Sequence, residues 1–366
     1  MYTMASLWHD RISISIFGES HGPAIGVVID GLPSGEYIRT EELRAFMSRR
    51  APKKNETSTS RNEQDLPQIM SGVLNNRTTG TPLCAMIQNT DQHSGDYKNV
   101  QSLARPGHAD YTGSKRYQGF NDVRGGGHFS GRLTAPLVFA GALCGQILER
   151  RGIYTGAHIA SIHGIKDKEF NHVSVSRDDI LNVRHKEFPV IDDIQGEKMI
   201  ADVKKAHDCL DSLGGIIECA CINIPAGIGS PIFDGLENTI SQLVFGIPAV
   251  KGIEFGAGFK AAEMLGSQNN DEFYVDDHGR VMTRTNHHGG ILGGIASGMP
   301  IVFKVAIKPT PSIGKEQKTI DYSNLKNDVI TVKGRHDPCI VPRAVPCVES
   351  AANIAILNHI LDYPNF

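Results

Sequence analysis

Residues 11–30, RISISIFGESHGPAIGVVID, decide between two fold classes. Polar and apolar residues alternate over residues 11–17 and β-branched residues are frequent over residues 24–30, so both segments are predicted to be strands. The turn between them contains Gly-x-Ser-x-Gly, which in an α/β-hydrolase places a nucleophilic serine between a strand and a helix. Here a second strand follows instead, and GLPSG (residues 31–35) ends it in another turn. The segment therefore predicts two strands joined by a turn, and it disfavours the hydrolase fold.

Two neighbouring residues of that turn are candidates for a functional role. Ser20 is interpreted as a turn residue whose hydroxyl bonds to the backbone or to a ligand. His21 is the better candidate for a chemical role, because it lies in a glycine-flanked turn between two strands, where a side chain can face a cleft. A histidine held for purely structural reasons is the alternative interpretation.

The rest of the chain mixes strands and helices without regular β-α-β alternation and without repeats. A helix is expected to begin at Thr40, which would cap it, and the last long helix is expected to follow Pro342 and Pro346. Further strands are predicted at 82–87, 157–162, 216–224, 250–255 and 301–307, a hairpin at 273–283, and helices at 133–150, 197–210, 235–245 and 344–361. This pattern favours α+β layers in a single domain spanning residues 1–366 over a doubly wound sheet.

Composition and charge indicate whether the protein is secreted, membrane-bound or nucleic-acid-binding. The chain has 366 residues and a formal net charge of −3, so no global charge steers it to nucleic acid. Its seven cysteines form no Cys-x-x-Cys pair, which is typical of reduced thiols in a cytosolic protein. The first residues lack the basic start and apolar core of an export signal, and the longest apolar stretches meet glycine, proline or charge before they reach membrane-spanning length. The expectation is a cytoplasmic protein that binds neither nucleic acid nor a membrane.

Arginines and histidines recur on glycine-rich loops. Four segments carry them: LARPGHADY (103–111), DVRGGGHFSGR (122–132), TNHHGGILGGIAS (285–297) and GRHDPCIVPR (334–343). A fifth segment, KPTPS (308–312), follows a predicted strand and has the polar character of a phosphate contact. The chain has no P-loop, no Rossmann fingerprint and no zinc-binding motif. Successive glycines can expose N–H donors to a phosphate or cofactor, arginine suits bidentate contact with anions, and histidine can deliver a proton at neutral pH. These segments predict a site that binds a small polyanion and moves protons.

Some of these residues allow more than one interpretation. Asp110 could orient His108 or could be an Asx-turn residue. His287 and His288 could bind a metal, but without a supporting ligand motif a hydrogen-bonding or packing role is favoured. Arg335 and Asp337 could simply form a salt bridge.

Taken in order along the chain, these motifs resemble the chorismate synthase family. The resemblance rests on FGESHG (17–22), TTGTP (78–82), RPGHADYT (105–112), AVKGIEFG (249–256), NHHGGILGG (286–294), KPT (308–310) and GRHDPC (334–339), and it spans nearly the whole chain. It implies an α+β fold, a β-α-β sandwich of the chorismate synthase type with helices between antiparallel sheets, assembled as a homotetramer. It also implies the last common step of the shikimate pathway to the aromatic amino acids. In that step 5-enolpyruvylshikimate 3-phosphate loses phosphate and a proton by anti-1,4-elimination to give chorismate.

The cofactor that the resemblance implies is reduced FMN, although substrate and product show no net redox change. Reduced flavin can lend electron density to the allylic system while the C–O bond breaks, and can recover it as hydrogen leaves. Because no Rossmann fingerprint is visible, we expect a separate flavin reductase to supply the reduced cofactor. The resemblance also implies FAD and NADP as further nucleotides, and it implies no metal.

The resemblance also assigns roles to residues. His21 would protonate the flavin or hold its charge, His108 would protonate the departing phosphate, and Asp337 would accept the N5 proton of the flavin. Substrate-binding residues would be Ser20, Arg49, Arg50 and Arg105, with Arg335 contacting either substrate or flavin. The FMN cradle would consist of His128, Phe129, Ser130, Gly293, Lys308, Pro309, Thr310, Pro311 and Ser312, together with Arg335.

Three positions depart from the family pattern. His128 stands where the family commonly has arginine, Glu56 lies near the place of another arginine, and Pro248 replaces an asparagine. We expect these changes to alter the affinity for flavin or substrate and to leave the activity in place. Two rival functions stay open: a flavin-dependent enzyme for a different substrate, and an anion- or RNA-binding module working through residues 49–61. The acidic balance and the lack of interleaved aromatic residues argue against the second.

Overall fold

The first of two large sheets is built mainly from the N-terminal part of the chain. The computed structural model describes residues 6–52, 65–90, 102–332 and 337–363. Five antiparallel strands form this sheet, in the order β1 (Leu7–His9), β2 (Ser13–Gly18), β3 (Ala24–Asp30), β7 (Leu83–Gln88) and β4 (Pro67–Ser71). The β2–β3 pairing runs from Ser13 opposite Asp30 to Gly18 opposite Ile25. The two strands predicted on either side of the FGESHGP turn therefore form a hairpin.

The second sheet is also antiparallel and has five strands. Their order is β11 (Val250–Phe255), β16 (Ile301–Ile307), β10 (Gly215–Ile222), β8 (Tyr154–Ile162) and β9 (Ile165–Lys166). Side chains alternate between its two faces, as expected for strands. On β10, Ile217 and Cys219 belong to the main core, whereas Ala220 and Ile222 belong to a smaller core on the other face. Helix α4 (Arg177–Arg184) contributes Ile180 and Val183 to that smaller core.

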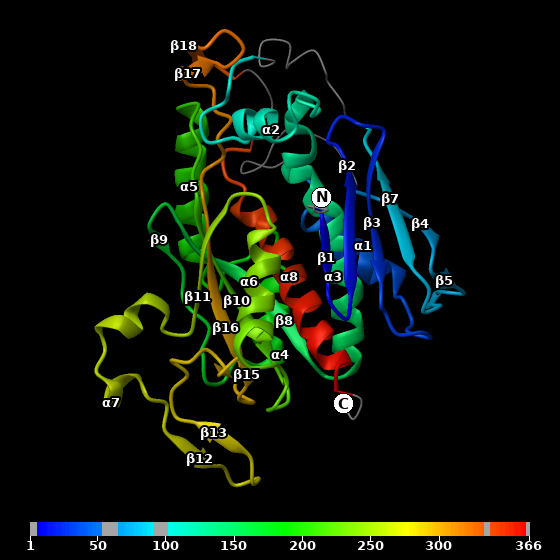
Figure 1. Cartoon of the computed structure of the whole chain (residues 1–366). Coiled ribbons are helices and arrows are strands. Elements are labelled where there is room, and N and C mark those ends of the chain that lie inside the picture. The colour runs from blue at the N-terminus through cyan, green and yellow to red at the C-terminus, as the bar shows by residue number, and fades with distance from the viewer. Residues whose placement is uncertain (1–5, 53–64, 91–101, 333–336, 364–366) are drawn as a thin grey trace.

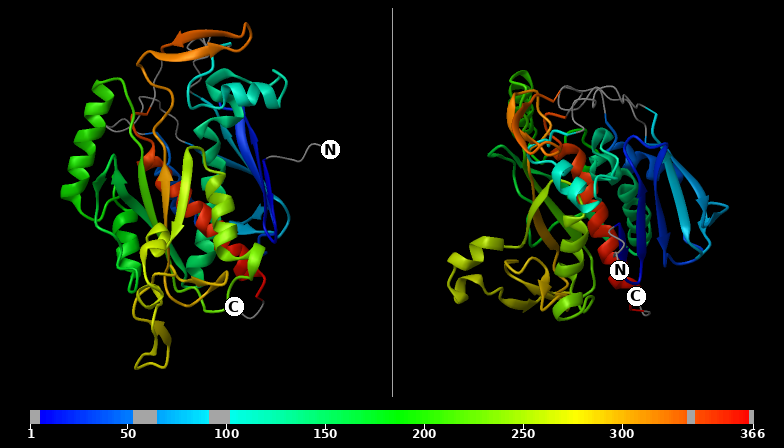
Figure 2. Two further views of the ribbon diagram at one scale, coloured as in Figure 1. Left: turned by 60° about the vertical axis from the view of Figure 1, so that its left-hand side comes forward. Right: turned by 45° about the horizontal axis from the view of Figure 1, so that its top comes forward.

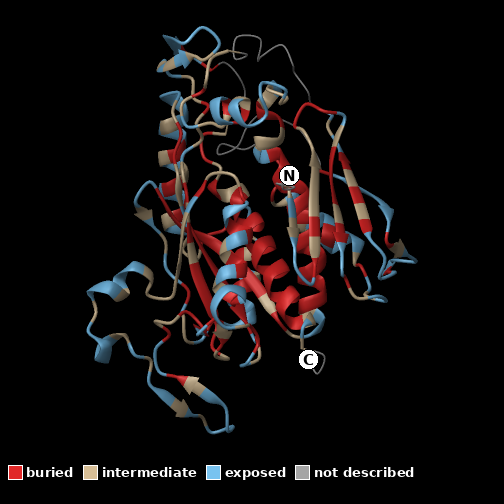
Figure 3. Ribbon diagram, in the orientation of Figure 1, coloured by how far each residue is buried: buried red, intermediate tan, exposed pale blue. Residues whose placement is uncertain are grey.

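Two long helices, α3 (Thr134–Arg150) and α8 (Val341–Leu361), fill the space between the sheets (Figures 1 and 2). They pack against each other, with α3 contacting β2, β3 and β7 and α8 contacting β8 and β10. Small residues allow the close approach: a Cβ added to Gly141 would lie 2.1 Å from the Cβ of Ser350. Both helices are buried almost throughout (Figure 3). The predicted α+β sandwich with helices between antiparallel sheets is confirmed.

Smaller elements surround this core. The remaining helices are α1 (Thr40–Ser48), α2 (Asp110–Arg116), α5 (Asp193–Asp208), α6 (Leu236–Phe245) and α7 (Gly266–Asn269). Four two-stranded ribbons complete the described structure: β5 (Val73–Leu74) with β6 (Arg77–Thr78), β12 (Phe273–Val275) with β13 (Val281–Thr283), β14 (Ile291–Leu292) with β15 (Ile295–Ala296), and β17 (Gln317–Asp321) with β18 (Lys326–Ile330). In Figure 1, α2 and the β17–β18 ribbon lie at the top, whereas α7 and the β12–β13 ribbon project at the lower left.

Two expectations about helix ends were wrong. Thr40 is the first helical residue of α1 rather than its cap, since Arg39 takes the N-cap position and no side chain caps the helix there. Helix α8 was expected to follow the two prolines, but it begins at Val341 and contains both Pro342 and Pro346. Pro342 lies in the first turn, where a helix does not need the missing N–H. The hydroxyl of Ser350, one turn later, donates to the carbonyl of Pro346 at 2.6 Å.

Helix α8 and residues Gly131–Arg150 are each long and apolar enough to cross a membrane by length and composition. This corrects the expectation that the apolar stretches fall short of that length. About nine-tenths of each is covered inside the structure, 94% for α8 and 89% for the other segment. A helix that is apolar all round is typical of a core that surrounds it on every side. The sandwich therefore accounts for their hydrophobicity.

A line of charged groups crosses the second sheet in its interior. His158 on β8 is fully buried, with Nδ1 3.1 Å from Asp167 Oδ2 and Nε2 2.8 Å from Glu218 Oε2. His172 Nε2 lies 2.9 Å from the other Glu218 oxygen. Burial disfavours the charged imidazole, but the two carboxylates outweigh it and raise the pKa of His158. Because each ring nitrogen faces a carboxylate, both must donate, and His158 is held as an imidazolium.

Candidate active site

A glycine turn separates two of the predicted catalytic histidines. Gly125, Gly126 and Gly127 all have positive φ, at 60°, 98° and 53°, which residues with a side chain rarely adopt. A Cβ added to Gly125 would lie 2.1 Å from Cε1 of His21, and one added to Gly126 would lie 3.0 Å from Cε1 and from Nε2 of His108. The backbone therefore passes between the two imidazoles at a distance that only glycine allows.

The turn that carries His21 is fixed to the glycine turn by hydrogen bonds. Ser20 Oγ donates to the carbonyl of Arg124 at 3.2 Å, and the Ser20 N–H donates to the carbonyl of Gly127 at 3.2 Å. His21 Nδ1 lies 3.1 Å from Ser20 Oγ. The hydroxyl has one proton, which the Arg124 carbonyl accepts, so His21 Nδ1 must be the donor to Ser20. This arrangement fixes the His21 ring and leaves Nε2 as the nitrogen that can exchange a proton.

Ser20 does not stand in a nucleophile elbow. Strand β3 follows the turn directly, so the strand-to-helix geometry that the hydrolase interpretation requires is absent from residues 6–52. The Ser20 hydroxyl bonds to the backbone, one of the two roles expected for it.

Arg105, His108 and Asp110 form one compact cluster. Asp110 accepts two hydrogen bonds from the Arg105 guanidinium, at 2.8 Å from Nε and 2.7 Å from Nη2, and lies 2.8 Å from His108 Nδ1. Burial raises the pKa of Asp110, but the hydrogen bonds from Arg105 and His108 outweigh it and hold that pKa well below its usual range. An ionised Asp110 therefore accepts the Nδ1 proton of His108 and orients the ring, so that Nε2 faces the glycine turn.

The segment Lys308–Ser312 lies against this cluster. Lys308 Nζ donates to the carbonyl of Gly107, and Ser312 Oγ is 3.3 Å from Nη1 of Arg105. Burial and the neighbouring Lys251 lower the pKa of Lys308. Thr310 Oγ1 is buried and has no hydrogen-bond partner among the described residues. The predicted cofactor segment therefore offers a cation and an unused hydroxyl, and its Ser312 lies beside Arg105.

The β17–β18 ribbon, neither strand of which is predicted from the sequence, contacts the segment that leads to Arg105. Leu103 pairs with Asp321 in an isolated bridge, and the Ala104 N–H donates to the carbonyl of Ile320 at 3.2 Å. Tyr322 N–H donates to the carbonyl of Ser102 at 3.0 Å. These backbone contacts place the segment that leads to Arg105 and His108 along the edge of the ribbon.

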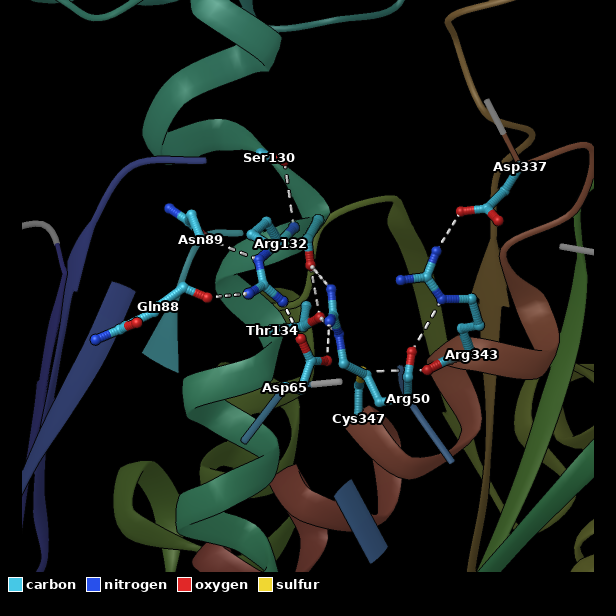
Figure 4. Close-up of polar contacts among 11 residues, drawn as sticks. Arg50, Asp65, Gln88, Asn89, Ser130, Arg132, Thr134, Asp337, Arg343 and Cys347 are labelled. Carbon is cyan, nitrogen blue, oxygen red and sulfur yellow. Dashed lines mark hydrogen bonds and ion pairs between the residues drawn. The ribbon is translucent and has the colours of Figure 1, made fainter. Parts of the chain in front are cut away.

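Arg49 and Arg50 have different partners despite being adjacent. Arg49 forms a bidentate ion pair with the buried Glu349 of α8, at 2.5 and 2.9 Å. Arg50 pairs instead with Asp65, whose carboxylate also pairs with Arg132 (Figure 4). Arg50 therefore shares one carboxylate with Arg132, whereas Arg49 pairs with a carboxylate of α8.

Asp337 is held by Arg343, an arginine that no sequence motif marks as a site residue. Its carboxylate pairs with Nη1 of Arg343, whose Nε donates to the backbone carbonyl of Arg50 at 2.9 Å (Figure 4). The structure therefore connects the third predicted catalytic residue to the Arg50 cluster. Arg335 and Glu56 lie outside the described residues.

The remaining predicted cofactor residues separate into two places. His128 Nδ1 donates to the carbonyl of Gly18 at 2.8 Å, Phe129 packs near Gly113 and Tyr117, and Ser130 Oγ accepts from the Arg132 N–H at 3.3 Å. These three residues adjoin the glycine turn. Gly293 lies in the turn of the β14–β15 ribbon, which precedes β16, whereas Lys308 follows the far end of β16, a strand roughly 20 Å long at about 3.3 Å per residue. Gly293 therefore lies in a different element from the other members of the predicted cradle.

The groups that could hold a metal lie elsewhere. Among the described residues, Glu169, His172 and Glu218 place their ligand atoms within 4.8 Å of one another. Lys304 Nζ lies 2.6 Å from Glu169 and 4.0 Å from Glu218, so an ammonium group already supplies a cation there. The adjacent histidines 287 and 288 bond to Asp271 and to backbone, as the hydrogen-bonding interpretation expected.

Replacing Gly125 by alanine is expected to lower turnover by at least about tenfold, because the new Cβ would displace the His21 ring and small misplacements of catalytic groups are costly. Gly119→Ala is the matched control: its φ is also positive, at 81°, but no atom lies within 4 Å of the added Cβ. Steady-state kinetics on the two variants separate displacement of His21 from backbone strain. Equal losses in both would contradict this assignment.

Comparison with known proteins gives one consistent result. A family model described as chorismate synthase matches residues 12–361. A curated protein named chorismate synthase from Thermococcus kodakarensis is 44% identical over 350 residues, which cover 96% of each chain. One of the same name from Korarchaeum cryptofilum is 45% identical over 347 residues, covering 94% of each. A crystal structure of chorismate synthase superposes with a TM-score of 0.75 at 26% identity, over 98% of this chain and 93% of that one.

Proposed function

This chain belongs to the chorismate synthase family of lyases, and from that premise we propose that it converts 5-enolpyruvylshikimate 3-phosphate into chorismate and phosphate. The proposed reaction is an anti-1,4-elimination that depends on reduced FMN and shows no net redox change. The observation that carries the proposal is the pair His21 and His108 on either side of the glycine turn, with Arg105 beside His108. A cation next to a proton donor suits the departure of a phosphate group.

The substrate carries a phosphate and two carboxylates, so it needs several cationic partners. Arg105 would bind one anionic group, because Asp110 holds its guanidinium in place and the adjoining Lys308 adds positive charge. His108 would act as general acid, delivering the Nε2 proton to the departing phosphate while Asp110 stabilises the imidazolium through Nδ1. Ser20, Arg49 and Arg50 complete the proposed substrate-binding set.

The residues present fit a flavin phosphate. Thr310 has a buried hydroxyl with no partner among the described residues, and Lys308 and Ser312 flank it. Lys308 to Ser312, with His128, Phe129 and Ser130, would hold FMN, and Gly293 and Arg335 complete the proposed set. When bound, reduced FMN would supply electron density to the allylic system during loss of phosphate. His21 would hold a proton at Nε2 on the flavin side of the site, and Asp337 would accept a proton.

The direct test is an anaerobic assay with chemically reduced FMN and 5-enolpyruvylshikimate 3-phosphate. We expect chorismate and inorganic phosphate to appear in equal amounts, and neither to appear with oxidised FMN. Reduced FMN that binds without yielding either product would favour a flavin enzyme for a different substrate. Salt-dependent retention of RNA that is lost in the Arg49→Ala, Arg50→Ala variant would favour the binding-module alternative.

We also propose that residues 1–366 act as a single domain in a cytoplasmic homotetramer served by a separate flavin reductase. The arm formed by residues 256–283 supports the oligomer, because it projects from the sandwich (Figure 1) and exposes Phe259 (82%), Leu265 (68%) and Phe273 (61%). Exposed apolar side chains of this size are typical of protein interfaces. Sedimentation velocity measures the assembly, and a monomer at micromolar concentration would contradict it.

A further inference from the structure

A chain of buried polar contacts leads from Asp65 to the turn that carries His21. The Asp65 side chain is fully buried, and each of its oxygens pairs with an arginine, Arg50 on one side and Arg132 on the other (Figure 4). Burial raises the pKa of Asp65, but the two guanidinium groups outweigh it and lower that pKa. Asp65 is therefore ionised at neutral pH, and it allows two guanidinium groups to be buried side by side.

Arg132 connects Asp65 to Asn89 by hydrogen bonds. Its Nε donates to Asn89 Oδ1 at 3.0 Å, and its Nη2 donates to the carbonyl of Gln88 at 3.3 Å (Figure 4). Asp65 fixes the other end of the same guanidinium through Nη1. A planar guanidinium held at both ends has one orientation, so the position of Asn89 Oδ1 depends on Asp65.

Asn89 in turn clamps the turn that carries His21. Its Nδ2 donates to the carbonyl of Glu19 at 2.9 Å and to the carbonyl of Gly22 at 2.8 Å. These two carbonyls lie on either side of Ser20 and His21 in the sequence. Both protons of the amide are therefore used, and its oxygen must accept from Arg132. The amide cannot rotate without breaking contacts at both ends.

We propose that Asp65 is a positioning residue for His21, acting through Arg132 and Asn89. The inference rests on the proposed function for the catalytic role of His21, but the contacts themselves do not depend on it. Asp65 lies 44 positions after His21 and does not contact it in this chain of bonds. It acts by fixing the turn, and through the turn it fixes the ring whose Nδ1 donates to Ser20.

The test uses Asp65→Asn, Asn89→Ala and the double variant of the full-length protein. Histidine-selective isotope labelling follows the titration of the His21 ring by NMR without substrate, and steady-state kinetics give kcat and KM. We expect both single variants to shift the His21 titration and to lower kcat by about 10- to 100-fold, with a smaller change in KM. The double variant should be no more than about threefold slower than the slower single variant, because both changes interrupt one path.

Asp167→Asn is the matched control, since its carboxylate is equally buried and also bonds to a charged partner, but in the second sheet. It should leave the His21 titration and kcat unchanged. If Asp65→Asn does not fold, Asn89→Ala alone decides, because it leaves the pairs of Asp65 with both arginines in place. An unmoved His21 titration in Asn89→Ala, a loss confined to KM, or losses that multiply in the double variant would overturn the proposal. Absence of chorismate in the wild-type assay would instead refute the proposed function, and the NMR result would still stand.

Discussion

Replacing His108 by alanine is expected to lower kcat by about 10²–10⁴-fold and to leave FMN binding unchanged, because the variant loses the proposed general acid but none of the residues proposed to hold the flavin. Asp110 accepts the Nδ1 proton at 2.8 Å, which leaves Nε2 as the nitrogen that delivers a proton. Asp110 also keeps Arg105 in place through two further hydrogen bonds, and these do not involve His108. The alanine variant should therefore lose proton transfer and keep its anion-binding guanidinium.

Single-turnover kinetics under anaerobic conditions give the chemical step, and fluorescence titration gives the FMN dissociation constant. His278→Ala is the control, since that histidine is exposed in the turn between β12 and β13. Asp110→Asn should also slow the chemical step, because an amide can accept the Nδ1 proton but stabilises the imidazolium less well. A His108→Ala enzyme that turns over at the wild-type rate would refute the assignment of His108 as general acid.

Strands and helices with a clear hydrophobic pattern could be predicted from the sequence. Alternation over residues 11–17 and the β-branched run over residues 24–30 each predict a strand, and the observed strands begin at Ser13 and Ala24, within two residues of the predicted starts. Helix α3 could be predicted because it is largely apolar and is followed by Arg151-Gly152. The short ribbon β17–β18 could not, since its strands are polar and mostly exposed and owe their place to pairing with residues 102–104.

The sequence also indicated several members of the candidate site but not their partners. Successive glycines at 125–127 predict N–H donors for a phosphate or cofactor, yet only the structure shows that they separate His21 from His108. Asp65 was not singled out, because its partners lie 15 and 67 positions away and no local motif marks it. Arg49 and Arg50 are the same residue type at adjacent positions. Only the tertiary structure shows that Arg49 pairs with Glu349 whereas Arg50 pairs with Asp65. Such differences arise from tertiary packing and leave no signal in spacing.

The largest effect on stability is expected at His158, which lies apart from the candidate site. Replacing it by glutamine should lower the free energy of unfolding by about 3–5 kcal/mol, the usual cost of leaving buried carboxylates without their partner. Asp167 and Glu218 are both fully buried and would lose a charged donor each. His163→Ala is the control, because the pair that His163 forms with Asp202 is largely exposed and should contribute less than about 1 kcal/mol. Urea denaturation of the three proteins measures the difference.

The pH dependence of that difference provides a second check. Burial raises the pKa of Glu218, but the hydrogen bonds from His158 and His172 outweigh it and lower that pKa from 4.5 to about 2, so its contribution is complete above pH 4.5 and is lost as the pH falls toward 2. The pKa of His158 is raised from 6.5, so its contribution is complete below pH 6.5 and is lost as the pH rises through the raised value. The wild type should therefore exceed His158→Gln in stability most strongly between pH 4.5 and 6.5. A difference that stays constant down to pH 2 would show that packing, rather than the charge on His158, stabilises this part of the sheet.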